Sequence, residues 1–288
     1  MYTVKRAAEI VGVSTSTLRA WERRYGTEAT TRSDAGYRLY DEQAVRRFVL
    51  LKALIDDGLS AREAAEEIRR RDATGVLAPS GPLPDNLELA RAAERLDPAE
   101  VERALRLRLA ASPFEAVVDQ WLLPSLVELG DAWKSGEVSV AGEHMVAEAV
   151  RRVLAAEYEY PRPAAAGRPV LIGLPPGARH DLGLLSFAVA ARRAGIPTTY
   201  LGADVPAESW QTAVAGGCSA VVMAVSRKPD LKNFERVHSE LRAGRRRLKI
   251  AVGGALQAET PADCLQLGHE VGPAALALSR ELGLPDAA

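Results

Sequence analysis

The stretch YTVKRAAEIVGVSTSTLRAWERRYG (Tyr2–Gly26) decides the fold of the N-terminal part of this chain. Its apolar residues recur at helical spacing on both sides of a turn at Gly12–Ser14, which predicts two short helices. Ser14 is a suitable N-cap for the second helix, because its hydroxyl can accept a hydrogen bond from the backbone N–H of Thr17. Five apolar residues would hold the two helices across each other: Ala7, Ala8, Ile10, Val13 and Leu18. The pattern is typical of a helix-turn-helix.

Arginine and aromatic residues gather on the second of these helices. In a helix-turn-helix this helix enters the major groove of DNA, where a guanidinium can bind guanine edges or phosphate oxygens. The candidate DNA contacts on it are Ser16, Thr17, Arg19, Trp21, Arg23, Arg24 and Tyr25. Met1–Arg47 holds nine Lys and Arg against six Asp and Glu, a net charge of +3 in a chain that totals −1. We therefore expect a local basic patch for double-stranded DNA.

Composition narrows the class of protein. The 288 residues are 47% hydrophobic and 26% charged, the proportions of an ordinary soluble protein. The sequence shows neither an apolar leader nor a stretch long enough to span a bilayer, so we expect a cytoplasmic protein without a membrane partner. The two cysteines, Cys218 and Cys264, do not form a CxxC pair, which argues against a structural zinc or a redox motif.

Two stretches rich in Pro and Gly divide the chain. GVLAPSGPLPDN (Gly75–Asn86) and YPRPAAAGRP (Tyr160–Pro169) lack helical periodicity and predict linkers. Between them, Leu and Ala recur at helical spacing over 87–96, 100–109, 114–133 and 140–158. We therefore expect a DNA-binding domain over 1–74, a linker over 75–86, a four-helix bundle over 87–160 and a further domain over 161–288.

The last of these segments alternates between two kinds of pattern. PVLIGL, TTYL, SAVVMAV and LKIAV are short β-prone runs, and each is followed by a loop and a helical stretch. This alternation predicts a parallel sheet with right-handed crossovers, a Rossmann-like (flavodoxin-like) domain. The continuous apolar run SAVVMAV indicates a central strand that is buried on both faces. The fold class is therefore multi-domain, α and α/β.

The family of the first domain is indicated by the segment TRSDAGYRLYDEQAVRRFVLLKALIDDGLSAREAAEEI (Thr31–Ile68). With the preceding helix it resembles the MerR family of transcriptional regulators. The residues that match the family pattern are Arg19, Trp21, Glu22, Arg23, Gly36, Tyr37, Arg38, Tyr40, Gly58 and Ser60. The resemblance implies a winged helix-turn-helix in which Arg19 reaches base edges and Arg24, Arg32, Tyr37 and Arg38 hold phosphates. Because one such unit makes a small interface, we expect self-association on a near-palindromic site.

A histidine in the C-terminal domain stands at a position where ligands bind. In open parallel sheets, ligands lie at the carboxyl ends of the strands. LPPGARHDLGLL (Leu174–Leu185) follows the first predicted strand and places His180 there, between two glycines that allow a tight turn. VGGAL (Val252–Leu256) adds two glycines after the fourth strand. Taken alone, His180 is better explained as a loop histidine that is hydrogen-bonded to backbone carbonyls.

This combination resembles the cobalamin-binding domain, with its D-x-H-x-x-G, S-x-L and G-G signature. The resemblance implies that His180 is the lower axial ligand of cobalt, and that Gly183, Gly253, Gly254 and, in a shifted loop, Ser226 bind the cofactor. In the bundle, Trp133 followed after nine residues by Glu143 and His144 resembles the cap of CarH-like regulators, the light-responsive branch of the MerR family. There these three residues cover the upper face of adenosylcobalamin.

Three residues depart from these patterns. Ala178 stands where an acid normally supports the histidine, and Ala224 stands where the S-x-L serine is expected. Lys134 replaces the histidine that captures cobalt from above after light removes the adenosyl group. A protonated lysine has no lone pair to give, so we expect no stable bis-histidine photoproduct.

The sequence thus predicts a DNA-binding regulator, not an enzyme, and a repressor whose binding to DNA and assembly into a dimer or tetramer depend on adenosylcobalamin or another cobalamin. Two alternatives stay open at this point. The departures at Ala178, Ala224 and Lys134 favour a regulator whose cobalamin domain is degenerate and serves protein–protein contacts. A corrinoid-carrying enzyme subunit would also combine a bundle with an α/β domain, but it would not need a DNA reader.

Overall fold

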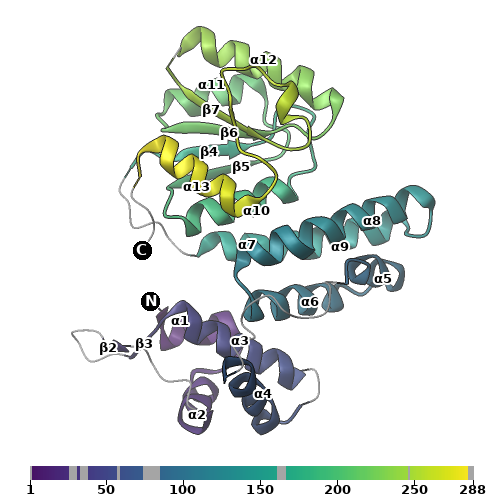
Figure 1. Cartoon of the computed structure of the whole chain (residues 1–288), viewed down its shortest axis with the longest axis vertical. Coiled ribbons are helices and arrows are strands. Elements are labelled where there is room, and N and C mark those ends of the chain that lie inside the picture. Colours follow the sequence, from purple (N-terminus) through teal and green to yellow (C-terminus); the bar gives the residue numbers. More distant parts are fainter. Residues whose placement is uncertain are drawn as a thin grey trace.

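The chain folds into three parts, which follow one another from the N-terminal to the C-terminal end (Figure 1). The computed structural model describes residues 2–25, 31–32, 38–56, 59–73, 85–160, 167–245 and 247–284. The predicted fold class, a helix-turn-helix, a helical bundle and a parallel-sheet domain, is confirmed. Of the described residues, those in helices form no segment that is long and apolar enough to cross a membrane.

The first part is a helix-turn-helix with a small sheet. Its elements are β1 (Tyr2–Thr3), α1 (Val4–Val11), α2 (Thr15–Tyr25), β2 (Thr31–Arg32), β3 (Arg38–Tyr40), α3 (Glu42–Asp56) and α4 (Ala61–Ala73). The three strands pair antiparallel in the order β1-β3-β2. Ser14 Oγ accepts from the Thr17 N–H at 3.0 Å, which confirms the predicted cap of α2. Leu18, Tyr40 and Phe48 are fully buried at the centre.

The bundle contains the four predicted helical segments. They are α5 (Glu88–Arg95), α6 (Pro98–Ala111), the succession α7 (Phe114–Val117), η1 (Val118–Leu122) and α8 (Leu123–Ser135), and α9 (Val140–Glu159). Asp97 caps α6 by accepting from the Glu100 N–H at 3.0 Å. The π-helical turn η1 precedes Pro124, which lacks an N–H and would crowd the carbonyl four residues back. The wider turn accommodates this proline inside an otherwise continuous helix.

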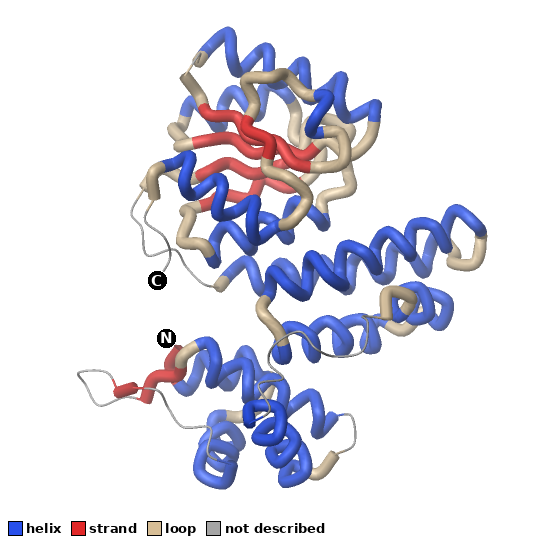
Figure 2. Tube along the Cα trace, in the orientation of Figure 1, coloured by secondary structure: helices blue, strands red, loops and turns tan. Residues whose placement is uncertain are grey.

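The third part is a five-stranded parallel sheet between two layers of helices (Figure 2). Its elements are β4 (Val170–Gly173), α10 (Leu182–Arg193), β5 (Thr198–Gly202), α11 (Ala207–Ala215), β6 (Ala220–Ala224), α12 (Lys228–Gly244), β7 (Lys249–Gly253), η2 (Gln257–Glu259), β8 (Leu265–Gln266) and α13 (Val271–Leu282). The strand order is β5-β4-β6-β7-β8, so the run SAVVMAV does form the central strand. Helices α10 and α13 pack together on one face, and α11 and α12 on the other. The short edge strand β8 adds a fifth strand to the four β-prone runs.

The three parts share packed interfaces. The bundle and the α10–α13 face of the sheet form one apolar core, in which α9 packs against α10. The DNA-binding part packs through α3 against α6, where Leu50, Leu51 and Leu54 share a cluster with Ala110. The bundle therefore lies between the helix-turn-helix and the sheet (Figure 1).

Candidate DNA-binding surface and cofactor site

Helix α2 presents the candidate DNA contacts. Ser16, Arg19, Arg23 and Arg24 are exposed, and Thr17 is half-buried. The Ser14 hydroxyl lies 2.7 Å from the hydroxyls of both Ser16 and Thr17, so a small hydroxyl cluster stands at the N-terminus of the helix. A helix N-terminus with hydroxyls and nearby arginines can bind phosphate and base edges.

Two aromatic residues of the same helix also serve the core. Trp21 is half-buried against both apolar clusters of this domain, and Tyr25 packs on the α3–α4 side. Each therefore helps to fix the angle at which α2 meets its neighbours. Arg32 lies in β2, whereas Tyr37 and Gly36 lie outside the described residues.

Glu22 ties the recognition helix to β3. Its Oε2 accepts from Arg38 Nη1 at 3.0 Å and from the Tyr40 hydroxyl at 3.1 Å. Burial, and after it the Glu22 carboxylate, raise the pKa of Tyr40 to about 12. Arg38 remains 41% exposed, so it can still reach a phosphate while Glu22 orients it. Sequence matching identified Glu22, but the structure shows what it holds.

The three cap residues lie around the turn between α8 and α9. Trp133, near the end of α8, is 46% exposed, which is unusual for so large an apolar side chain. Glu143 and His144 lie in the first turn of α9, whose N-cap is Ser139, and the Glu143 carboxylate contacts His144 Nδ1. Lys134 pairs with Asp131 at 2.8 Å on the exposed side of α8. Trp133 and His144 are therefore available to a ligand and do not form the bundle core.

The loop between β4 and α10 carries His180. Gly177 adopts a φ of +77°, as expected of a tight turn, and Ala178 is buried. His180 is exposed and makes no hydrogen bond with any other residue that the structure describes. Asp204, which follows β5, holds this loop: its Oδ1 accepts from the Gly177 N–H at 2.6 Å, and its own N–H donates to the Ala178 carbonyl at 2.9 Å.

Asp181, next to His180, is buried and turned toward the bundle. Its Oδ2 accepts from Arg151 Nη1 of α9 at 2.6 Å and from the Tyr200 hydroxyl at 2.9 Å. It stands at the N-cap position of α10 without capping the helix: both donors bind Oδ2, and Oδ1 is buried without a hydrogen-bond partner among the described residues. Burial, and after it the Asp181 carboxylate, raise the pKa of Tyr200, while the hydrogen bond to Asp181 raises the pKa of Arg151.

The Arg151–Asp181 pair brings the loop and the cap to the same helix. Arg151 lies seven positions after His144, which is about two turns of α9. A Cβ on Gly183, at the start of α10, would lie 3.8 Å from Leu123 of α8, so the loop also meets the other helix of this pair. The cap residues therefore stand farther along the two helices against which the loop packs.

The loops after β6 and β7 hold the remaining candidates. Ser226 is exposed, and Ala224 ends β6. A Cβ on Gly254 would come within 2.5 Å of the Val225 carbonyl oxygen, and its φ of +91° also favours glycine. A Cβ on Gly253 would meet nothing within 4 Å, so the space beside it is open. Gly254 is therefore required by the packing of the two loops, and Gly253 is not.

The donor set suits a corrin. A corrin supplies the four equatorial nitrogens of its cobalt, so the protein needs to provide a single axial ligand, and an imidazole is a good one. His180 is exposed and uncommitted, and the exposed indole of Trp133 can cover a flat apolar ring. Within the described residues, the one cluster of three metal-type ligands is His238, Asp263 and Cys264. There the carboxylate is already shared by His238 and Arg242, on the opposite part of the sheet domain.

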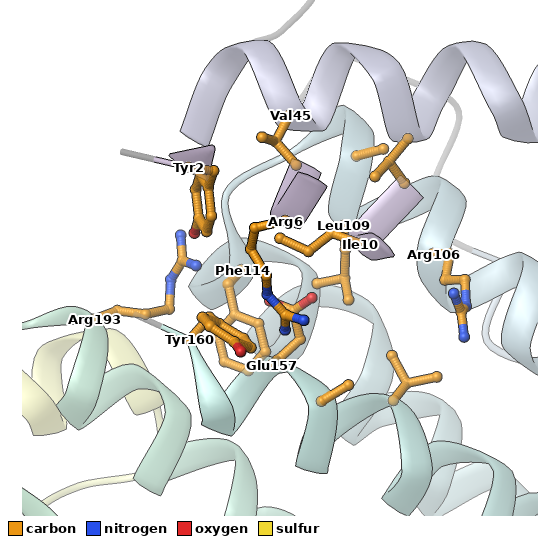
Figure 3. Close-up of a pocket in the computed structure, with 14 residues that line it drawn as sticks. Tyr2, Arg6, Ile10, Val45, Arg106, Leu109, Phe114, Glu157, Tyr160 and Arg193 are labelled. Atoms are coloured by element: carbon orange, nitrogen blue, oxygen red, sulfur yellow. The ribbon is translucent and has the colours of Figure 1, made fainter. Parts of the chain in front are cut away.

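A cavity of about 330 Å³ lies where the DNA-binding part meets the bundle (Figure 3). The Arg6 guanidinium stacks on the Tyr160 ring at 3.8 Å, and the Tyr2 ring lies 6.5 Å from that of Tyr160. Tyr160 is the C-cap residue of α9, the helix that carries Glu143 and His144 near its N-terminal end. Arg193 of α10 reaches the same cavity from the sheet domain.

Sequence reasoning missed Arg151, Tyr200 and Asp204. Arg151 and Tyr200 belong to regular elements and carry no motif, and Asp204 follows a strand at a position where acids are common in turns. Its position at the carboxyl end of a strand, where ligands bind in parallel sheets, was the one signal that could have identified Asp204 as a candidate.

Comparisons with known proteins agree with this arrangement. Residues 2–70 match the profile described as MerR HTH family regulatory protein, and residues 87–156 and 169–280 match two profiles, each described as B12 binding domain. The HTH-type transcriptional repressor CarH of Myxococcus xanthus is 34% identical over 283 residues, which is 94% of each chain. The repressor CarA of the same organism is 33% identical over 73% of this chain and 71% of its own.

A solved structure shares the fold of the effector half. The monomethylamine corrinoid protein of Methanosarcina barkeri superposes with a TM-score of 0.52 and 21% identity, over 67% of this chain and 96% of that one. The two repressors thus match over 94% and 73% of this chain. The chain therefore belongs to the MerR family of DNA-binding transcriptional regulators, in the group that carries B12-binding domains.

Proposed function

We propose that this chain is a cytoplasmic repressor whose assembly on an operator is controlled by adenosylcobalamin. The observation that carries the proposal is that the side chains of His180 and Trp133, in the effector half, are accessible to a ligand. His180 has no hydrogen-bond partner among the described residues, and it lies in the loop whose Asp181 pairs with Arg151 of α9. Trp133 of α8 is 46% exposed. Both side chains are therefore accessible to a ligand, and an imidazole and an indole are the types that ligate a metal and cover a flat ring.

The residues divide the work of binding. His180 would give its ring nitrogen to the lower axial position of cobalt, and Trp133 would cover the upper face with Glu143 and His144 beside it. Gly253 and the exposed Ser226 would line the loops at the carboxyl ends of β6 and β7. Adenosylcobalamin supplies a cobalt–carbon bond that visible light can break.

We also propose that light controls the protein, but without a second nitrogen ligand from residue 134. Lys134, paired with Asp131, offers no lone pair while it is protonated, so it cannot take up an axial position after the adenosyl group leaves. Lys134 would therefore not help to retain the cofactor after illumination, and we expect the illuminated protein to exchange cobalamin more readily.

DNA binding would use α2 and the wing. Arg19 would reach base edges, while Arg24 and Arg38 would hold phosphates, with the hydroxyls of Ser16 and Thr17 at the helix N-terminus. A single unit of this size makes a small interface with DNA, so we propose that two or more copies bind together. Repression would follow from the cofactor-dependent assembly of those copies.

The test combines cofactor binding with DNA binding. Purified protein is mixed with adenosylcobalamin in the dark and desalted, and its visible spectrum is recorded before and after green light. A duplex obtained by selection from random DNA is then titrated by fluorescence anisotropy, with and without the cofactor, and the mass of each complex is measured by light scattering. We expect a coloured protein, tighter DNA binding in the dark and a larger assembly.

Three outcomes would contradict separate parts of the proposal. A colourless protein would overturn the cofactor. A bound spectrum that does not change in green light would remove light control alone. Equal DNA affinity with and without bound cofactor would favour a domain that serves protein–protein contacts. His180→Ala is the control for axial ligation, since its spectrum should lose the contribution of the lower nitrogen ligand.

A further inference from the structure

His180 needs an acceptor that its own loop does not supply. A histidine that ligates a metal through one ring nitrogen carries a proton on the other, and that N–H usually donates to a carboxylate or a carbonyl, which fixes the ring and raises its basicity. Ala178 has no polar side chain, and the Asp181 carboxylate is buried against Arg151 and Tyr200. Asp181 Oδ1 has no partner among the described residues, but it is buried, whereas His180 is exposed. An exposed acceptor for His180 therefore has to come from another segment of the chain.

Asp204 lies against this loop at the right place. It follows β5, beside β4 in the sheet, and it bonds to the two residues that precede Arg179 and His180: its Oδ1 accepts from the Gly177 N–H, and its N–H donates to the Ala178 carbonyl. The next residue, Val205, donates to the Leu174 carbonyl at 3.1 Å, so both ends of the turn are fastened to the same short segment.

The backbone of Asp204 is held in an uncommon conformation. Its φ is +53°, in the left-handed region, where residues other than glycine are rare. The hydrogen bonds to Gly177 and Ala178 maintain this conformation, and they aim the carboxylate at the histidine loop. Asp204 is exposed, and its second carboxylate oxygen has no hydrogen-bond partner among the described residues. A site that keeps a strained backbone and a spare acceptor beside a prospective ligand points to a function for both.

We propose that Asp204 is the positioning residue of His180. Its Oδ1 fixes the loop through Gly177, and its other oxygen accepts the ring N–H of His180 when the imidazole ligates cobalt. Asp204 thus replaces, from a neighbouring strand, the acid that is absent at Ala178. The inference rests on the proposed function, because it concerns a histidine that binds cobalamin.

The test isolates the second oxygen. Asp204→Asn keeps an acceptor for the Gly177 N–H and tolerates the left-handed conformation, but it replaces the other oxygen with an N–H donor. We expect the affinity for adenosylcobalamin to fall about tenfold to a hundredfold. After reconstitution with the Co(II) form of cobalamin, we expect the nitrogen splitting in the electron paramagnetic resonance spectrum to weaken, while the melting temperature of the protein without cofactor stays unchanged.

The controls separate positioning from a general charge effect. Glu208→Gln removes an exposed carboxylate from the first turn of the neighbouring helix α11 and should leave affinity and spectrum unchanged. In a His180→Ala background, Asp204→Asn should have no further effect, because the two residues act through one hydrogen bond. Adding Ala178→Asp to Asp204→Asn should restore nitrogen ligation.

Each result decides one proposal or both. A wild-type protein that binds no cobalamin overturns the proposed function together with this inference. Wild-type affinity and nitrogen splitting in Asp204→Asn overturn the inference alone. An equal loss of affinity in the presence and absence of His180 also overturns it, since Asp204 would then act on the cofactor or the fold without the histidine.

Discussion

Glu22 supports the candidate DNA-binding surface by orienting other side chains, although it is not itself a candidate DNA contact. It is 10% exposed and accepts from Arg38 and from the buried hydroxyl of Tyr40. Because the carboxylate has two donors, its removal leaves Tyr40 buried without an acceptor and frees Arg38 to move. The residue thus couples the stability of the domain to the orientation of a candidate phosphate contact.

We expect Glu22→Ala to lower the free energy of unfolding of the DNA-binding part by about 1–3 kcal/mol, the penalty for a buried hydroxyl without a partner. Affinity for the selected duplex should fall as well, since Arg38 loses its orientation. Urea denaturation and fluorescence anisotropy measure the two effects. Glu66→Ala, which breaks the exposed Arg62–Glu66 pair on α4, is the matched control and should leave the denaturation midpoint in place. Identical midpoints for both variants would contradict the role given to Glu22.

The adjacent glycines Gly253 and Gly254, after β7, differ in how much space surrounds them. Gly254 cannot accept a Cβ, because the Val225 carbonyl oxygen would lie 2.5 Å away and the backbone is left-handed. Gly253 ends β7 beside open space. Both were predicted from one G-G signature to bind the cofactor, and that assignment stays a prediction for each of them.

Alanine substitution separates packing from binding at these positions. We expect Gly254→Ala to destabilise the sheet domain by about 1–3 kcal/mol or more, through the contact with Val225 and the positive φ. Gly253→Ala should change the free energy of unfolding by no more than about 0.5 kcal/mol. Its Cβ would instead enter the space beside the loop and weaken cobalamin binding. Calorimetry and a cofactor titration on each variant test this, and unimpaired cofactor affinity in Gly253→Ala would contradict a close approach there.

The sequence was informative about elements and less so about the contacts between them. Helical spacing, the cap at Ser14 and the apolar run of β6 are local or continuous patterns, so the helix-turn-helix, the bundle helices and the central strand could all be predicted. Strands β1 and β8 are two residues long, too short to carry a period, and they exist because a partner strand is present. Asp181 and Asp204 bond to residues about 30 positions away, which no spacing rule encodes.

At the scale of the whole molecule, two contacts among the described residues connect the DNA-binding part to the effector half. One is the apolar contact of α3 with α6, and the other is the stack of Arg6 on Tyr160 beside the cavity shown in Figure 3. A stack of this kind contributes about 0.5–1 kcal/mol when it is exposed and more when it is desolvated. It is therefore strong enough to hold one orientation and weak enough to be released.

We expect Tyr160→Ala to loosen this junction without unfolding either half. The thermal transition of the DNA-binding part should separate from that of the bundle and occur at a lower temperature, because the two no longer stabilise each other. Differential scanning calorimetry measures the separation. Lys5→Ala, which alters an exposed neighbour of Arg6 on α1, should leave the calorimetric trace as in the wild type. A trace for Tyr160→Ala that matches the control would show that the stack does not couple the halves.

Helix α9 connects the predicted cap residues to the part of the chain that contains the helix-turn-helix. Its 20 residues make a rod about 30 Å long, with Glu143 and His144 in its first turn and Tyr160 just past its last. Near the middle of the helix, Arg151 pairs with Asp181, and this pair is a point about which the helix could tilt. A rotation of about 10° about that point would carry each tip roughly 2–3 Å in opposite directions, given the rise of a helix. In the proposed function, the cofactor would contact the N-terminal end of this helix and the DNA-binding part contacts its C-terminal end. A tilt of the helix would then transmit cofactor binding to the DNA-binding part without a change in the shape of any loop.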